Sequence, residues 1–235
     1  LSPLPYTLYS LNEQTGEILW GYKILEPGRE GIQGNSVYDG IVYVSTSNPY
    51  DLYVRLYALD ALTGTLKWTT KLDGLGGVTN PVVSASVVVV GTNGIYALDA
   101  RTGKLLWTYK VGDLYETPTI ANGKVFIYDG KHSIQVFTLS TGQLVWSRRV
   151  GWVSIYKSAP AYTQGLVFIG TLNGRLHALK ESNGEQGWSN FIGGQIWSSP
   201  AIADGKVFIS SLDNKVHAID VRSGTQVWVR SIFEG

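Results

Sequence analysis

The clearest pattern in the chain is the sequence IYALDARTGKLLW at residues 95–107, which is nearly repeated as LYALDALTGTLKW at residues 56–68. In both stretches an apolar run ends at an aspartate, a Thr-Gly dipeptide follows, and a tryptophan comes four residues after the glycine. Short runs rich in Ile, Leu, Tyr and Trp are typical of β-strands, and Thr-Gly is typical of the turn between them. The pattern therefore predicts a β-hairpin.

The same hairpin pattern occurs six times along the 235 residues, with Asn-Gly or Ser-Gly replacing Thr-Gly in the last two copies. Successive tryptophans are 48, 39, 39, 42 and 40 residues apart. A period of about 40 residues indicates an array of one supersecondary unit, and the regular spacing favours a packing role for the tryptophans. The six tryptophans, which we interpret as wedges between neighbouring units, are Trp20, Trp68, Trp107, Trp146, Trp188 and Trp228.

A second hairpin is predicted between successive tryptophan hairpins. In the third repeat, Asn122-Gly123 separates the apolar runs 117–121 and 125–128, and Asn-Gly between two such runs is a strong hairpin signal. Ser84-Ala85-Ser86 breaks this pattern in the second repeat. The matching dipeptides elsewhere are Asp39-Gly40, Gln164-Gly165 and Asp204-Gly205.

Four antiparallel strands in each unit of about 40 residues predict an all-β fold, a β-propeller of four-stranded blades. If the strands of a blade are named A to D from the central channel outward, the tryptophan hairpin is C–D and the other hairpin is A–B. The chain has six C–D hairpins and five A–B hairpins. We therefore expect five full blades plus an extra outer hairpin, with residues 1–235 as a single propeller domain that is part of a larger propeller or is itself incomplete.

The stretches 56–68 and 95–107 resemble the PQQ-like, or WD40-like, repeat of the quinoprotein (pyrroloquinoline quinone, PQQ) dehydrogenase-like β-propellers, including their BamB-like branch. The resemblance extends from Leu8 to Trp228. It implies either PQQ-dependent dehydrogenase chemistry or, in the BamB-like branch, a scaffold that contacts a partner in a cell-envelope assembly.

Composition narrows the classes of partner. The net charge is +1 and there is no long basic cluster, so a nucleic-acid partner is not expected. No apolar stretch approaches the roughly 20 residues of a membrane-spanning helix. The chain contains neither cysteine nor methionine. We therefore expect an exported protein from which a leader has been removed, or a piece of a longer protein.

The D–A connections are the candidate binding residues because they lie at the channel mouth of a propeller and depart most from the repeat. Aromatic walls with single polar groups would suit a small ligand or a peptide side chain. Alternatively, Trp152 and Trp197 plug the channel. The candidates at this mouth are Gln33, Tyr115, Glu116, Trp152, Tyr156, Lys157 and Trp197.

The B–C loop of the first full repeat is longer than its counterparts and contains Asn48, Tyr50 and Asp51. A loop that outgrows its repeat is either a binding loop on a rigid scaffold or a tolerated insertion.

No catalytic or metal-binding residue is predicted. The resemblance implies a vicinal cysteine pair and a calcium site beside the quinone, but the chain lacks cysteine, and Asp129 and Asp213 each stand alone in a B–C loop. His177 and His217 occupy a strand position that is Tyr in other copies, and His132 has no ligand partner at metal spacing. No cofactor is therefore expected, and PQQ with calcium belongs only to the dehydrogenase alternative.

The sequence favours a non-enzymatic, extracytoplasmic propeller, periplasmic, extracellular or at the cell surface, that serves as a protein-interaction scaffold or ligand-recognition module. The expected partners are subunits of a cell-envelope assembly. Two alternatives from other classes remain: a fragment of a PQQ-dependent alcohol or sugar dehydrogenase, and a structural subunit of a cell-surface assembly. An extracellular sensor domain of a membrane receptor would also fit the pattern.

Overall fold

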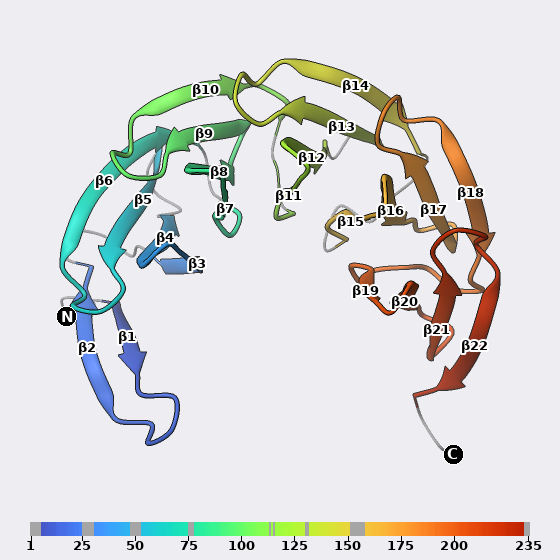
Figure 1. The fold of residues 1–235 in the computed structure, drawn as a ribbon, viewed down its shortest axis with the longest axis horizontal. Helices are drawn as coiled ribbons and strands as arrows, with labels where there is room; N and C mark the ends of the chain where they lie inside the picture. The colour runs from blue at the N-terminus through green and yellow to red at the C-terminus, as the bar shows by residue number, and fades with distance from the viewer. Residues whose placement is uncertain are drawn as a thin grey trace. The chain divides into compact units, whose positions relative to one another are not determined.

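A computed structural model describes residues 6–24, 31–47, 53–74, 78–112, 114, 116–129, 132–150 and 158–232. All regular elements in these ranges are β-strands, and none of these residues forms a helix able to cross a membrane (Figure 1). The chain divides into two compact units. The first contains strands β1 to β10 and the turn residues Ser140–Gly142, and the second contains β11 to β22.

The first unit contains one two-stranded and two four-stranded antiparallel sheets, each built from consecutive strands. The tryptophan hairpins supply β1–β2, β5–β6 and β9–β10. The bounds are β1 Thr7–Leu11, β2 Ile18–Lys23, β3 Gly31–Tyr38, β4 Ile41–Ser47, β5 Tyr53–Asp60, β6 Leu66–Asp73, β7 Val82–Ser84, β8 Val87–Gly91, β9 Ile95–Asp99 and β10 Leu105–Tyr109.

The second unit contains three four-stranded antiparallel sheets with the same consecutive order. Together, the described residues form five four-stranded sheets and one two-stranded sheet, which confirms the predicted five blades plus an outer hairpin. The bounds are β11 Thr119–Ala121, β12 Lys124–Tyr128, β13 Ser133–Thr138, β14 Leu144–Arg149, β15 Ala161–Thr163, β16 Leu166–Gly170, β17 Arg175–Lys180, β18 Gln186–Phe191, β19 Ala201–Ala203, β20 Lys206–Ser210, β21 Lys215–Asp220 and β22 Gln226–Ser231.

Four of the C–D turns are closed by an Asp or Asn side chain at the end of the C strand. Asp99 Oδ1 accepts hydrogen bonds from the backbone N–H groups of Arg101 and Thr102 at 3.1 and 2.8 Å. The Asp99 carbonyl accepts from Gly103 N, and Gly103 has a φ of +70° that glycine adopts without steric cost. The side-chain oxygens of Asn12, Asp60 and Asp220 accept the same backbone hydrogen bonds in their turns.

A β-bulge interrupts all six C–D hairpins, a feature that the sequence pattern did not predict. In the first hairpin Ser10 pairs with Trp20 and Leu11 pairs with Ile18, so Leu19 has no partner in the register. A bulge increases the local twist and redirects the neighbouring side chain. The residues left unpaired in this way, each directly before the tryptophan, are Leu19, Lys67, Leu106, Val145, Gly187 and Val227.

The A–B turns share one backbone conformation even where the sequence pattern breaks. Asn122 and Gly123 have φ values of +48° and +68°, the two positive angles of a tight hairpin turn. Ala85 and Ser86 have φ values of +47° and +63° at the same place. The flanking strands therefore impose the turn on two residues that disfavour it.

Each of five tryptophans packs on the C–D turn glycine of the following sheet. Trp68 Nε1 donates to the Ala100 carbonyl at 3.1 Å, and a Cβ added to Gly103 would lie 2.5 Å from Trp68 Cε3. Only a glycine leaves room for the indole there. The five contacts are Trp20 with Gly64, Trp68 with Gly103, Trp107 with Gly142, Trp146 with Gly184, and Trp188 with Gly224.

The cores lie between adjacent sheets of a unit. In the first unit Tyr43 is 1% exposed, and its hydroxyl donates to the Ala100 carbonyl of the next sheet at 3.0 Å. Burial raises the pKa of Tyr43 to about 12, so the hydroxyl keeps its proton. In the second unit Phe168 and Ile219 belong to one cluster that also includes Trp188.

One inter-sheet contact in the second unit is charged. Glu181 is buried and accepts hydrogen bonds from Asn122 Nδ2 at 3.0 Å, from Lys124 Nζ and from the Tyr162 hydroxyl. Burial alone would raise the pKa of Glu181, but the bonds from Lys124, Tyr162 and Asn122 outweigh burial and hold this pKa below its usual value. The carboxylate is therefore ionised and fully partnered at the boundary between two sheets.

Substitution of the turn glycines tests the wedge contact. We expect Gly184→Ala to lower the free energy of unfolding by roughly 1–3 kcal/mol more than Gly205→Ala, because its Cβ would lie 2.7 Å from Trp146 Cε3. Gly205 is the matched control: its φ is +69° against +72° for Gly184, and nothing lies within 4 Å of its added Cβ. Urea unfolding of both variants measures the difference. Equal losses would show that the indole does not constrain the turn.

Candidate protein-interaction site

The structure describes three of the seven residues predicted at the channel mouth. Gln33 and Glu116 belong to the first unit and Trp197 to the second. The predicted residues that lie outside the described ranges are Tyr115, Trp152, Tyr156 and Lys157 at the mouth, and Asn48, Tyr50 and Asp51 in the long B–C loop.

Gln33 occupies a bulge in the β3–β4 ladder. Ile32 pairs with Thr46 and Gly34 pairs with Ser45, so Gln33 has no partner in the register and its side chain is exposed. A Cβ on Gly34 would lie 1.7 Å from Asn80 Oδ1, so the glycine is required for the close approach of Asn80. Glu116, which precedes β11 in the sequence, is half-buried.

Trp197 lies in the connection between β18 and β19 and is 48% exposed. Its Nε1 donates to Gln195 Oε1 at 3.1 Å. Ile196, between these two residues, is fully buried. Its side chain packs against Gly170, where a Cβ added to the glycine would lie 2.1 Å from Ile196 Cγ2. Ile196 therefore anchors the loop in the core, while Trp197 is presented to solvent rather than filling the interior.

A second apolar side chain lies on the adjoining B–C loop. Leu212 is 57% exposed, and its backbone N–H donates to the Gln195 carbonyl at 2.9 Å. A Cβ on Gly194 would lie 2.5 Å from Asp213 N, so the two loops pack with their backbones in direct contact. Leu212 was missed by sequence reasoning because a single leucine in a short loop has no periodic signal.

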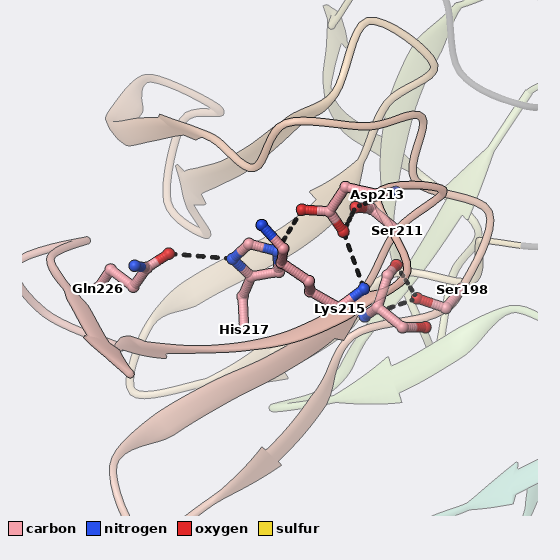
Figure 2. A network of polar contacts seen from close by, with 7 residues as sticks. Ser198, Ser211, Asp213, Lys215, His217 and Gln226 are labelled. Atoms are coloured by element: carbon pink, nitrogen blue, oxygen red, sulfur yellow. Dashed lines mark hydrogen bonds and ion pairs between the residues drawn. The ribbon is translucent and has the colours of Figure 1, made fainter. Parts of the chain in front are cut away.

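A polar network fixes the B–C loop of the last sheet (Figure 2). Asp213 Oδ1 accepts from Ser211 Oγ at 2.6 Å and from Lys215 N at 3.0 Å, and Asp213 Oδ2 lies 2.9 Å from His217 Nε2. The other ring nitrogen of His217 lies 2.9 Å from Gln226 Oε1. The interpretation of Asp213 as an isolated turn residue is thus wrong, because the loop folds back and brings its carboxylate to the buried His217.

The preceding sheet shows what the carboxylate contributes. His177 occupies the place of His217, but Asn173 takes the place of Asp213, and its Oδ1 accepts from Thr171 Oγ1. His177 Nε2 is buried without a hydrogen-bond partner among the described residues. Burial lowers the pKa of His177, in keeping with a neutral ring. The Asp–His pair thus distinguishes the last sheet from its neighbour.

The electrostatics of Asp213 favour its charged form. Burial raises the pKa of this carboxyl, but the hydrogen bonds from Ser211, His217 and Lys215 N have the larger combined effect and hold the pKa below its usual value. Ser198 holds the connection between β18 and β19 to the end of β20, because its Oγ donates to the Ser210 carbonyl at 2.8 Å (Figure 2). Both loops that present Trp197 and Leu212 are therefore held by side-chain bonds to the sheet.

The described residues do not assemble a cation site. No three His, Asp or Glu side chains among them come together as metal ligands. Asp129 accepts from Ser133 N and Gln135 Nε2 at 3.0 Å each, and Asp213 is engaged in its own loop. These two carboxylates therefore do not fit the calcium that a quinone site would require.

A groove of about 480 Å³ lies in the first unit. Its walls include Asp39, Asp60, Lys67 and Arg101, and these charges already pair within it. Lys67 Nζ lies 3.0 Å from Asp60 Oδ2, and Arg101 Nη2 lies 3.7 Å from Asp39 Oδ2.

Asp213→Asn is expected to destabilise the protein in a pH-dependent way. A carboxyl whose pKa is lower in the folded state stabilises the fold above its unfolded-state pKa, and this stabilisation is lost as the pH falls through the folded-state pKa. We expect a loss of roughly 1–3 kcal/mol at neutral pH, as for hydrogen bonds to charged groups, shrinking as the pH falls below 3.8. Denaturant unfolding across pH measures it.

The control for this measurement is Asp204→Asn, a change at an exposed residue of an A–B turn. The free energy of unfolding of Asp204→Asn should differ from that of the wild type by a nearly constant amount over the same pH range. If the difference in free energy of unfolding between Asp213→Asn and the wild type does not change with pH, the charge of the Asp213 carboxylate does not stabilise the folded protein.

Comparison with solved structures shows the same fold at low sequence identity. BamB from Moraxella catarrhalis is 23% identical with a TM-score of 0.72, over 92% of this chain and 65% of that one. The computationally designed Ika8 protein is 19% identical with a TM-score of 0.72, over 92% and 65% of the two chains. A europium-containing methanol dehydrogenase is 15% identical with a TM-score of 0.79, over 100% and 67%.

This chain therefore spans about 65% of the length of the M. catarrhalis BamB. No curated protein matches the sequence. The sequence model of one family, described as outer membrane protein assembly factor BamB, matches residues 6–93, 55–152 and 148–231. These overlapping matches cover nearly the whole chain, and the protein belongs to this family of PQQ-like repeat propellers.

Proposed function

We propose that this protein is a non-enzymatic, extracytoplasmic scaffold that binds a protein partner in a cell-envelope assembly through Trp197 and Leu212. The observation that carries the proposal is the exposure of both side chains, 48% and 57%, on two loops joined by a backbone hydrogen bond. Trp is enriched among residues that dominate protein–protein binding energy, whereas a fold rarely gains from leaving an indole in water.

The rigidity of these loops supports a binding role. Ile196 anchors one loop in the core, and Asp213 with His217 braces the other. A surface that is ordered before binding loses less conformational entropy on association than a mobile one. The polar groups around the apolar pair, among them Gln195 and Ser211, would form the rim of such a contact.

The family supports the proposed location and class of partner. Its description names an outer membrane protein assembly factor, which suggests the periplasm or cell surface for this chain and subunits of an envelope assembly as its partners. The likeness to a methanol dehydrogenase supports the rival function, a fragment of a PQQ-dependent dehydrogenase. The carboxylates of Asp129 and Asp213, engaged in their own loops, favour the scaffold.

Binding to a purified outer-membrane assembly complex that lacks its own BamB tests the scaffold function. We expect Trp197→Ala and Leu212→Ala each to weaken binding about tenfold or more, the effect of removing a central apolar contact. Their melting temperatures should stay close to that of the wild type because both side chains are about half exposed and lie outside the core clusters. Surface-immobilised protein and a titration of the complex give the affinities.

Leu62→Ala is the matched control, since Leu62 is 88% exposed on a C–D turn of the first unit. It should bind like the wild type. If all three variants bind equally well, the loops of the last sheet do not form the contact.

An activity assay separates the scaffold from the dehydrogenase. We expect no dye reduction when the protein is given PQQ, calcium and a panel of alcohols and aldoses. Reproducible turnover that depends on added PQQ would overturn the non-enzymatic function.

A further inference from the structure

The connection between β18 and β19 carries an exposed aromatic side chain at each end. Phe191, the last residue of β18, is 59% exposed, and Trp197 is 48% exposed. Directly inside them lie Ile192 and Ile196, which are 4% and 0% exposed. Ile192 N also donates to the Gly174 carbonyl at 2.7 Å. The core therefore holds the connection at two points and leaves both aromatic rings in solvent.

The repeat itself does not require an aromatic ring at the position of Phe191. This position, three residues after the tryptophan, is exposed in all six C–D hairpins. The other five hairpins carry a cation or a serine there, namely Lys23, Lys71, Lys110, Arg149 and Ser231. Phe191 stays exposed although β11–β14 and β19–β22 flank its sheet within the second unit. Aromatic rings are enriched in protein–protein contacts, so the departure from the repeat indicates a binding role.

Arg175 lies over this ring. It begins β17, pairs with Phe191 across the ladder, and has its Cζ 6.0 Å from the ring centroid. A guanidinium that stacks on an aromatic face keeps its N–H groups available for a carboxylate. No Asp or Glu among the described residues forms an ion pair with Arg175. Asp213, on the adjoining loop, is bonded to His217 instead.

The exposed ring adjoins the proposed contact of Leu212 and Trp197. A Cβ added to Gly174 would lie 3.0 Å from Gly194 O and 3.1 Å from Phe191 Cε2. A Cβ added to Gly194 would lie 2.8 Å from the backbone carbon of Leu212. The three backbone segments are therefore in direct contact, and their exposed apolar side chains belong to neighbouring parts of one surface.

We infer that the protein partner of Trp197 and Leu212 places an acidic residue on Arg175, beside an apolar residue that packs on Phe191. The carboxylate would accept two parallel N–H bonds from the guanidinium, the paired geometry that Arg forms with carboxylates. A membrane surface attracts clusters of several cations, whereas Arg175 is a single cation stacked on a ring, which favours a protein carboxylate. The inference rests on the binding function proposed for Trp197 and Leu212, and it adds an electrostatic part to that contact.

Titration of the outer-membrane assembly complex that lacks its own BamB onto the immobilised protein tests the role of the ring. We expect Phe191→Ser to weaken binding about fivefold or more, because it removes an apolar contact. Its melting temperature should stay close to that of the wild type, since the chain already pairs Ser231 with Lys215 at this place in the last hairpin. Lys110→Ser, at the same exposed position in the first unit, is the control and should bind like the wild type.

Substitution of Arg175 tests the charge. Arg175→Gln should weaken binding about three- to fivefold, as for an exposed ion pair, and Arg175→Glu should weaken it further because the partner carboxylate would then face a like charge. Raising the ionic strength should weaken binding of the wild type more than binding of Arg175→Gln. The matched control is Lys110→Gln, which also removes one exposed cation and should leave the affinity unchanged.

The same titration separates this inference from the proposed function. If Trp197→Ala weakens binding while Phe191→Ser and Arg175→Gln do not, the extension is wrong and the proposed function stands; if none of these variants weakens it, both are wrong. Loss of binding that is matched by a lower melting temperature in both Phe191→Ser and Arg175→Gln would make the pair a structural contact and overturn the inference. So would vesicles rich in phosphatidylglycerol that bind the wild type but not Arg175→Gln, because the cation would then belong to a lipid headgroup.

Discussion

The packing of an indole on a glycine is the contact on which the repeated sheets depend. The glycine is needed for two reasons at once: its positive φ closes the C–D turn, and its missing Cβ leaves the space that the tryptophan of the preceding sheet fills. The bulge before each tryptophan contributes to this contact by changing the twist of the outer strand. A local turn and a long-range packing contact thus share one residue.

Much of this architecture could be predicted because strand, turn and spacing all carry periodic signals. The runs 95–99 and 105–109 are strands with the bounds expected from their residues. Ala85 and Ser86 adopt the positive φ values of an Asn-Gly turn although neither residue favours them. The pairing of the strands on either side of the turn requires this conformation. Sequence reasoning works from local preferences, and here tertiary structure overrides them.

The candidate site was less predictable because its chemistry comes from loops. Trp197 was found as a departure from the repeat, but its exposure follows from Ile196 taking the buried place beside it. The bond between Asp213 and His217 depends on how four residues fold back from a strand, which spacing alone does not reveal. Such loops on a rigid sheet are where proteins of one fold acquire different partners.

The Lys124–Glu181 contact has a consequence for how so repetitive a chain avoids errors while it folds. Similar repeats invite docking of a sheet against the wrong neighbour, a characteristic failure of repeat proteins. A sheet carrying Glu181 that docked one or more places out of order would bury its carboxylate against an apolar residue such as Ile41. An unpaired buried charge destabilises a structure by about 3–5 kcal/mol, which makes the misplaced arrangement much less stable than the correct one. The Lys124–Glu181 ion pair thus favours the correct order of these sheets over a misplaced one.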